Sequence, residues 1–307
     1  MNHVKIYLIL IAVMFVWGLN LPAVKYLTTQ VGPVTMTSMR IFIAAVMVFA
    51  ILHFMGLVRK PNRKEWGYII AGAMLNVVIH HYFISVGLTM TTGSNAGLIL
   101  GTGPMLTAIF GSLLLRMIPS VMQWLGFIFG LAGVTLTVIA GSGSATMISL
   151  GDLFVFISVI VQVLSFLVIS KASKTLDPRL LTGYMFLIGS LFLFVISIIQ
   201  EPKELRAFQS VTPMFWIAFF TSGMFATAIG HMLYNFAVGK VGPAKSAIFI
   251  NLNTLFALLG SVVMLGEEVT IVHLIGLVLI VSSVLLGSGA VEELWMKRKE
   301  KQHSIQA

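Results

Sequence analysis

Residues 66–115 read WGYIIAGAMLNVVIHHYFISVGLTMTTGSNAGLILGTGPMLTAIFGSLLL, and none of them is Asp, Glu, Lys or Arg. As one α-helix this stretch would be about 75 Å long. The hydrocarbon core of a bilayer needs only about 20 helical residues, so the stretch must fold back once. The predicted break is the Thr/Gly/Ser-rich run Thr89–Ser94, because such residues interrupt helices.

The same pattern of apolar segments and breaks continues on both sides of this stretch. The other breaks are Gly32-Pro33, Pro119-Ser120, Gly141–Ala145, Asp177-Pro178 and Gly242-Pro243. Apolar runs such as Phe42–Phe54 lack the alternation of β-barrel strands. We therefore predict an all-α polytopic membrane protein with ten transmembrane helices, at about 4–26, 33–56, 66–88, 92–115, 121–141, 150–171, 180–200, 214–238, 243–265 and 270–290.

The composition supports the membrane class. Of the 307 residues, 58% are hydrophobic and 9% are charged, whereas soluble domains carry about 25% charged residues. These values exclude a soluble enzyme and a disordered chain. A net charge of +9 often indicates nucleic-acid binding. Here the basic residues flank apolar segments, so we expect no nucleic-acid partner. The chain has no Cys, which excludes disulfides and thiol chemistry.

The basic residues predict the orientation. With a cytoplasmic N-terminus, 14 of the 19 Lys and Arg residues face the cytoplasm, and the opposite side has only Lys203 and Arg206, offset by Glu201 and Glu204. This asymmetry predicts cytoplasmic N and C termini in the cytoplasmic membrane, with a basic anchoring tail at 292–307. The first apolar segment is longer than the roughly 7–15-residue core of a signal peptide, and no A-x-A-like site follows it, so we expect no cleavable signal.

The chain also contains an internal repeat. Gly93–Ile99 matches Gly242–Ile248, and Leu106 through Ser112 matches Leu255 through Ser261, both at an offset of 149. Two five-helix halves follow, residues 1–145 and 146–291. Because five is odd, the second half enters the membrane inverted. The charge reversal between Arg116 and the corresponding turn Glu267-Glu268 agrees with an inverted repeat.

These features occur together in one known family. The order is Trp17-Gly18-Leu-Asn20, Arg40, an Ala/Gly-rich fourth helix running into Pro104, a fifth helix with Gly126, Gly130 and Gly133, a restart at Gly151-Asp152, and the turn Gly266-Glu267-Glu268. Over nearly its whole length the chain resembles the EamA-like family of the drug/metabolite transporter superfamily. The resemblance implies a ten-helix alternating-access carrier that moves small organic metabolites, amino acids or drugs, often out of the cell. Val161-Gln162-Val163 departs from a frequent Trp-Ala pair, which leaves the substrate class open.

Polar residues at mid-membrane are the candidate substrate pathway, because they are costly against lipid and so face a cavity or another helix. In the first helix Trp17 and Asn20 share one face. Trp17 is too central for an interfacial tryptophan. Asn20 either lines a cavity or bonds a neighbouring helix.

The third and eighth helices carry the other clusters. Asn76 and His80 share a face of the third helix, while His231, Tyr234 and Asn235 lie with Thr227 on the eighth. The repeat relates His81 to His231, so these histidines are either a paired site or packing residues with a hydrogen bond. The predicted pathway is Trp17, Asn20, Asn76, His80, Asn95, Gln162, His231, Tyr234, Asn235 and Asn251, at the interface of the two halves.

Other intramembrane residues are assigned differently. The stripe Gly93, Gly97 and Gly101 indicates close helix packing. Asn253 is a further candidate for the cavity wall. Arg40 lies near the outer third of the second helix, where it either extends to the surface or binds an anionic group. We expect no metal site, because no carboxylate or thiolate completes a zinc ligand set, and no cofactor.

No carboxylate is predicted at mid-depth, so coupling through an intramembrane carboxylate is excluded. Proton coupling through histidine and facilitated diffusion both stay open. The predicted function is a secondary, non-ATP transporter that exports small organic metabolites such as amino acids and acts as a monomer or homodimer in the bilayer. The alternatives are an intramembrane enzyme, which would need a set such as His-Glu-x-x-His, or a receptor or scaffold, which would add long loops.

Overall fold

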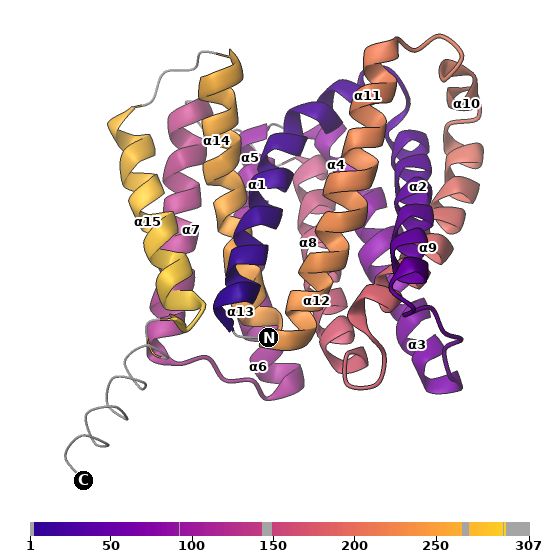
Figure 1. The fold of residues 1–307 in the computed structure, drawn as a ribbon. Coiled ribbons are helices and arrows are strands. Elements are labelled where there is room, and N and C mark those ends of the chain that lie inside the picture. The colour runs from indigo at the N-terminus through magenta and orange to yellow at the C-terminus, as the bar shows by residue number, and fades with distance from the viewer. Residues whose placement is uncertain (1–2, 92, 143–148, 266–269, 291, 293–307) are drawn as a thin grey trace, which may run out of the picture.

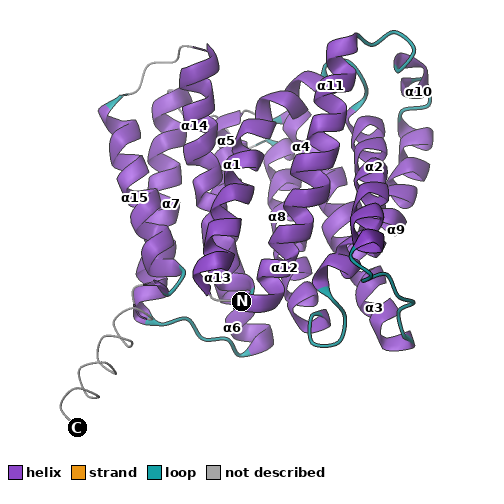
Figure 2. Ribbon diagram, in the orientation of Figure 1, coloured by secondary structure: helices purple, strands orange, loops and turns teal. Residues whose placement is uncertain are grey.

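The computed structural model describes residues 3–91, 93–142, 149–265, 270–290 and 292. Within these ranges the chain is helical throughout apart from short connections, and it contains no strand (Figure 2). The all-helical prediction is therefore confirmed for the described residues. The predicted boundary between the halves at 145–146, the turn Glu267-Glu268 and residues 293–307 of the predicted tail lie outside them.

The helical elements follow the predicted ranges closely. They are α1 His3–Thr28, α2 Pro33–Phe54, α3 Arg63–Gly72, the π-helix η1 Ala73–Ile79, α4 His80–Met90, α5 Gly93–Gly101, α6 Gly103–Leu115, α7 Val121–Ser142, α8 Leu150–Ala172, α9 Pro178–Gln200, α10 Glu204–Ala207, α11 Pro213–Thr221, the π-helix η2 Ser222–Gly230, α12 His231–Val241, α13 Pro243–Ala247, the 3-10 helix η3 Ile248–Ile250, α14 Asn251–Leu265 and α15 Ile271–Gly287.

Eight helices within the described residues are long and apolar enough to cross a membrane. They are His3–Thr28, Pro33–Phe54, Arg63–Met90, Asn95–Leu115, Val121–Ile139, Leu150–Ala172, Pro178–Gln200 and Pro213–Val241. A further apolar helix, Ile271–Gly287, is shorter, and the predicted segment 243–265 is divided among α13, η3 and α14. The chain is thus a polytopic membrane protein, and ten spans stay a prediction.

Local chemistry explains where these helices begin. Pro33 and Pro178 occupy the first turn of α2 and α9, where the missing N–H costs nothing because first-turn donors have no partner inside the helix. Asn62 and Ser149 begin α3 and α8 with reciprocal side-chain to backbone hydrogen bonds, the capping box. Two of the breaks predicted from proline are therefore helix starts.

The predicted helix 92–115 is interrupted at Thr102, between α5 and α6. Pro104 follows at once, and it can neither donate a backbone hydrogen bond nor accommodate the carbonyl four residues earlier. The Thr102 hydroxyl donates to the Ile99 carbonyl oxygen at 2.6 Å, which satisfies one carbonyl near the interruption. The interruption is local, and Asn95–Leu115 still forms one apolar helix long enough to cross a membrane.

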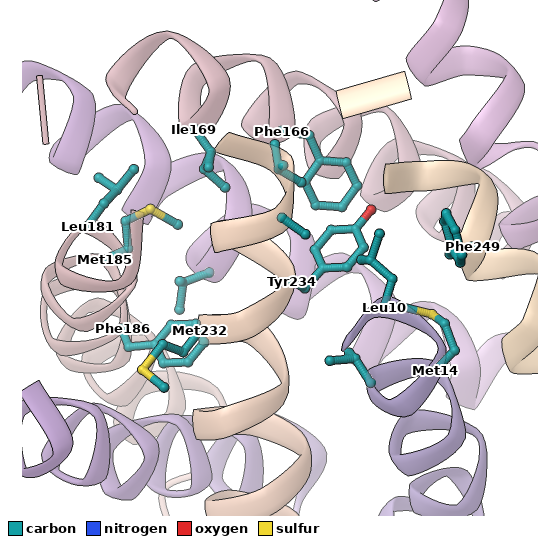
Figure 3. Packing of buried hydrophobic residues seen from close by; sticks show 14 of the residues in the cluster. Leu10, Met14, Phe166, Ile169, Leu181, Met185, Phe186, Met232, Tyr234 and Phe249 are labelled. Carbon is teal, nitrogen blue, oxygen red and sulfur yellow. The ribbon is translucent and has the colours of Figure 1, made fainter. Parts of the chain in front are cut away.

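The helices lie side by side as a single bundle in which segments far apart in sequence are neighbours (Figure 1). α7 packs along α15 at one edge and α2 along α9 at the other, with α1, α8, α12 and α14 between them. Glycine permits the close α7–α15 contact, since a Cβ added at Gly133 would lie 2.8 Å from the Gly276 carbonyl oxygen. Large side chains such as Phe166 and Tyr234 fill the middle of the bundle (Figure 3).

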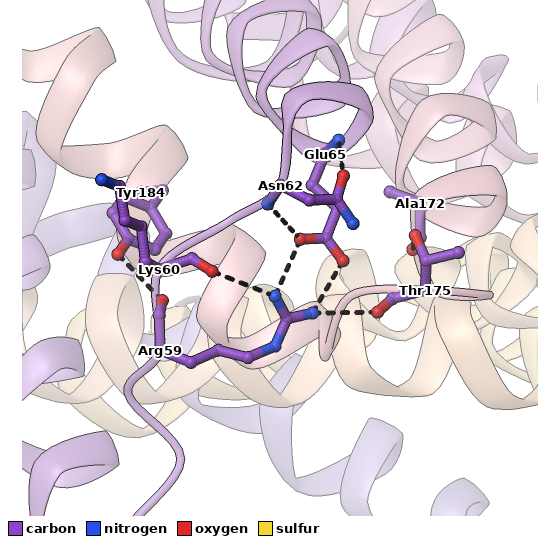
Figure 4. A network of polar contacts seen from close by, with 7 residues as sticks. All are labelled: Arg59, Lys60, Asn62, Glu65, Ala172, Thr175 and Tyr184. Carbon is purple, nitrogen blue, oxygen red and sulfur yellow. Dashed lines mark hydrogen bonds and ion pairs between the residues drawn. The ribbon is translucent and has the colours of Figure 1, made fainter.

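The connections gather at the two ends of the bundle (Figure 2). Polar contacts stabilise each end. At one end the Arg59 guanidinium donates to both Glu65 carboxylate oxygens at 2.7 and 2.8 Å and to the Thr175 carbonyl oxygen at 3.0 Å (Figure 4). At the other end Glu201 accepts hydrogen bonds from the backbone N–H groups of Val34 and Thr35. The Arg59 contacts join the α2–α3 connection to the α8–α9 connection. The Glu201 contacts join the start of α2 to the end of α9.

Candidate substrate cavity

A cavity of about 470 Å³ lies in the middle of the bundle, lined by residues from both halves of the chain. α1, α2, α4, α5, α6 and α7 contribute from the first half, and α8, η2, α12, η3 and α14 from the second. Its polar and aromatic wall consists of Trp17, Asn20, Arg40, His80, His81, Gln162, Phe166, Thr227, His231, Asn251, Asn253 and Thr254. The volume suits a small organic molecule, since ligand pockets span about 300–1,000 Å³.

Six of the ten residues predicted for the pathway line this cavity: Trp17, Asn20, His80, Gln162, His231 and Asn251. Trp17 lies where α1 meets η2, and its ring centroid is 4.7 Å from that of His231. Its indole nitrogen donates to the Ala226 carbonyl oxygen at 2.8 Å. The indole is therefore held in position on the wall.

His80 and Gln162 form a hydrogen-bonded pair across α4 and α8. The His80 Nδ1 lies 3.0 Å from the Ser158 carbonyl oxygen, and its Nε2 lies 3.1 Å from Gln162 Nε2. A carbonyl oxygen only accepts, so Nδ1 is assigned the proton and Nε2 accepts from the Gln162 amide. Both His80 ring nitrogens therefore have protein partners, Nδ1 on Ser158 and Nε2 on Gln162.

The histidines related by the repeat lie close together. His81 and His231 have ring centroids 6.3 Å apart, and His80 and His81 4.9 Å. His231 Nδ1 is 3.2 Å from the Thr227 carbonyl oxygen, one helical turn earlier. Among the described residues no group of three or more His, Cys, Asp and Glu is arranged to hold a metal ion.

Both central helices change to π-helix immediately before their histidines. η1 ends at Ile79, directly before His80, and η2 ends at Gly230, directly before His231. A π-helical turn shifts backbone hydrogen bonds from the fourth to the fifth residue and is frequent at functional sites. In η2 the Thr227 hydroxyl donates to the Ser222 carbonyl oxygen at 3.0 Å, and the Ala226 carbonyl accepts from Trp17. The π-helical turn η2 thus contacts two side chains that line the cavity, Thr227 and Trp17.

The other four predicted residues do not line the cavity. Asn76 donates to Ser165 Oγ at 2.8 Å, and Asn235 donates to Thr182 Oγ1 at 2.9 Å. Asn95 donates to the Asp152 carboxylate at 3.1 Å. Tyr234 is fully buried and packs against Trp17 and Phe166, with ring centroids 5.3 and 5.2 Å away. Figure 3 shows Tyr234 beside Phe166. All four make contacts between helices.

Arg40 is the residue whose position the sequence left undecided. Its side chain is 7% exposed and faces the cavity rather than the surface. Nη1 donates to Thr227 Oγ1 at 2.7 Å and approaches Ser222 Oγ at 3.5 Å. The sequence drew attention to Thr227 because it lies one helical turn before His231. It gave no indication that α2 packs on η2, which is what brings Arg40 to Thr227.

Comparison with known proteins identifies the family. A model of the EamA-like transporter family matches residues 4–139 and 149–289. The chain belongs to the EamA-like transporter family. It is therefore an integral membrane protein and a transporter, and the resemblance seen in the sequence is confirmed.

Relatives of similar length carry the same general description. The "Uncharacterized transporter YyaM" of Bacillus subtilis is 27% identical over 95% of this chain and 96% of that protein. The "Uncharacterized transporter sll0355" of Synechocystis is 24% identical over 93% of this chain and 90% of that protein. A solved crystal structure superposes with a TM-score of 0.79 at 18% identity, covering 94% of this chain and 98% of that one, which shows that the fold is shared.

Proposed function

We propose that this transporter is a secondary carrier that exports small organic metabolites, such as amino acids or related compounds, across the cytoplasmic membrane by alternating access. In this proposal ten spans form two inverted five-helix halves with both termini in the cytoplasm. The observation that carries it is the 470 Å³ cavity, whose polar wall comes from both halves. Sites between inverted repeats lie at the interface that opens alternately to each side.

Contacts between helices support the inverted repeat. α2 packs on η2 as α9 packs on η1, which is the same contact after exchange of the halves. A Cβ added at Gly126 would lie 2.9 Å from the Ser283 carbonyl oxygen, and one added at Gly276 would lie 2.9 Å from the Gly133 carbonyl oxygen. These two contacts are related by an offset of 150 residues. The separate matches of the family model to 4–139 and 149–289 agree with the same division.

The lining of the cavity favours transport over chemistry. Among the described residues no carboxylate lines it, and an intramembrane hydrolase would need a carboxylate or metal-activated water there. Amides, hydroxyls and imidazoles instead exchange hydrogen bonds with a passing polar solute. We therefore assign the substrate pathway to Trp17, Asn20, His80, Gln162, His231 and Asn251.

Flux through this cavity is testable because the chain contains no native cysteine. Purified protein in liposomes is screened with labelled amino acids and related metabolites, and the best solute is then measured with Thr254→Cys, a cavity position, before and after a methanethiosulfonate reagent. Gln209→Cys, exposed in the α10–α11 connection, is the matched control. We expect modification to stop flux only in Thr254→Cys. Flux that continues after complete modification there would refute transport through this cavity.

Export is tested in cells. Cells that produce the transporter should retain less of a toxic analogue of the solute than cells that produce the modified Thr254→Cys variant. If both kinds of cell retain the analogue equally while flux is present in liposomes, outward transport is refuted but transport as such is not.

A further inference from the structure

Arg40 is a buried cation without a carboxylate partner among the described residues. The six described acidic residues are engaged elsewhere: Glu65 with Arg59, Asp177 with Arg179, Asp152 at the start of α8, Glu201 and Glu204 at the start of α2, and Glu292 with Ser120. A buried charge is costly unless it is paired and hydrogen-bonded. A site for a negative group on the solute would supply that partner.

The hydrogen bonds of Arg40 leave a defined part of its guanidinium available. Nη1 is used by Thr227 and Ser222. Nε is buried without a hydrogen-bond partner, and the side-chain hydrogen bonds that Arg40 makes to the described residues use Nη1. Nε and Nη2 form the edge of arginine that binds a carboxylate through two parallel hydrogen bonds. Thr227, itself hydrogen-bonded to the Ser222 carbonyl oxygen, orients that edge.

We propose that Arg40 is the anion-binding residue of the cavity and that the transported solute carries a single carboxylate on an apolar body. Among the described residues Arg40 is the only Lys or Arg that lines the cavity, so this part of the site has one fixed positive charge. One guanidinium edge matches one carboxylate, whereas a phosphoryl dianion calls for further cations. Val134, Val138 and Leu100 provide an apolar wall for the remainder of the solute.

This inference rests on the proposed carrier function. It is tested by a binding measurement, so that the anion site and the carrier function can be refuted independently. Purified protein in phosphatidylcholine nanodiscs is titrated calorimetrically with 3-phenylpropanoate, 3-phenylpropanamide and 3-phenylpropylamine, which share one body and differ in the head group. Hexanoate, hexanamide and hexylamine repeat the series with an aliphatic body. We expect each carboxylate to bind at least about tenfold more tightly than its amide, as expected for a charge-assisted bidentate pair, and the amines not to bind.

The variants locate the effect. Arg40→Gln should abolish the preference for carboxylate over amide, and Arg40→Lys should weaken it, because lysine keeps the charge but lacks the planar edge. Arg206→Gln, at an exposed arginine in α10, is the matched control and should bind as the parent does. If Arg40→Gln does not fold, the head-group series on the unaltered protein still decides the question.

Three results would overturn the assignment. The first is that amides or amines bind as well as the carboxylates in both series. The second is that Arg40→Gln keeps the preference for carboxylate over amide, and the third is that 2-phenylethylphosphonate binds more tightly than 3-phenylpropanoate. Carboxylate binding at Arg40 without flux of any solute would leave this site standing and refute the carrier. Flux of uncharged solutes that Arg40→Gln does not alter would refute this site and leave the carrier standing.

Discussion

The indole Nε1 of Trp17 donates a 2.8 Å hydrogen bond to the carbonyl oxygen of Ala226, 209 residues later in the chain. Ala226 lies within η2, so the bond joins α1 to the π-helical turn that precedes His231. The Trp17 ring also packs on His231 at 4.7 Å between centroids. One side chain thus connects a helix of the first half to the histidine helix of the second, at the wall of the cavity.

Gly230→Ala tests this connection. A Cβ at position 230 would lie 2.5 Å from Trp17 Nε1, so the indole must move and its bond to Ala226 must lengthen or break. We expect a severalfold loss of flux and a loss of stability of about 1–3 kcal/mol, typical of overpacking. Flux and thermal unfolding are measured beside Gly67→Ala, an exposed position with no atom within 4 Å of the added Cβ. Parental flux in Gly230→Ala would show that the position of Trp17 is unimportant.

His231→Ala separates a pathway residue from a packing residue. His231 lines the cavity and packs against Trp17 and Phe186, with ring centroids at 4.7 and 5.5 Å. We expect transport to fall at least about tenfold, consistent with loss of one directional contact worth about 1.4 kcal/mol, while membrane insertion stays normal. Flux per inserted molecule is the measurement. Transport at the parental rate would remove α12 from the pathway.

Asn235→Ala should act on stability and not on solute preference. Asn235 is fully buried, and its Nδ2 donates to Thr182 Oγ1 at 2.9 Å, which joins α12 to α9. Hydrogen bonds between membrane helices contribute about 0.6 kcal/mol on average and up to about 2 kcal/mol. Thermal unfolding of Asn235→Ala, Thr182→Ala and the double variant should show a coupling of this size. An altered preference among solutes with unchanged stability would contradict the assignment.

Glu201→Ala should loosen the start of α2. The Glu201 carboxylate accepts from Val34 N at 3.1 Å, Thr35 N at 2.8 Å and Thr35 Oγ1 at 2.7 Å, and it also lies at the positive end of the helix dipole. Loss of such a cap costs about 1–2 kcal/mol. Unfolding of Glu201→Ala is compared with that of Lys203→Ala, an exposed neighbour. Equal stability of the two variants would mean that water replaces the carboxylate without cost.

Cysteine labelling tests the predicted orientation. Lys60 and Gln209 are exposed at opposite ends of the bundle, in the α2–α3 and α10–α11 connections. With cytoplasmic termini, an impermeant maleimide added to intact cells should label Gln209→Cys and spare Lys60→Cys, while permeabilised cells should show both. Labelling of Lys60→Cys from outside would reverse the topology.

The sequence alone determined the helical membrane architecture, because backbone groups in a bilayer must bond within the segment and helices satisfy that requirement. It also indicated that α2 begins at Pro33, since the effect of proline on a helix start is local. It placed Trp17, His80, Gln162 and His231 in the interior of the bundle, because polar groups facing lipid are costly.

The tertiary structure decided which interior residues reach the cavity. Asn76, Asn95, Asn235 and Asn251 occupy the same kind of position in sequence, and each amide donates to a residue of a neighbouring helix, Ser165, Asp152, Thr182 and Ser283 respectively, yet only Asn251 of these four lines the cavity. Arg40 was equally ambiguous until α2 was seen to pack on η2, which places Thr227 beside its guanidinium. Helical periodicity shows which face of a segment turns inward. Whether that face meets a cavity or another helix depends on the rotation and spacing of helices far apart in the chain, which are determined by packing between them.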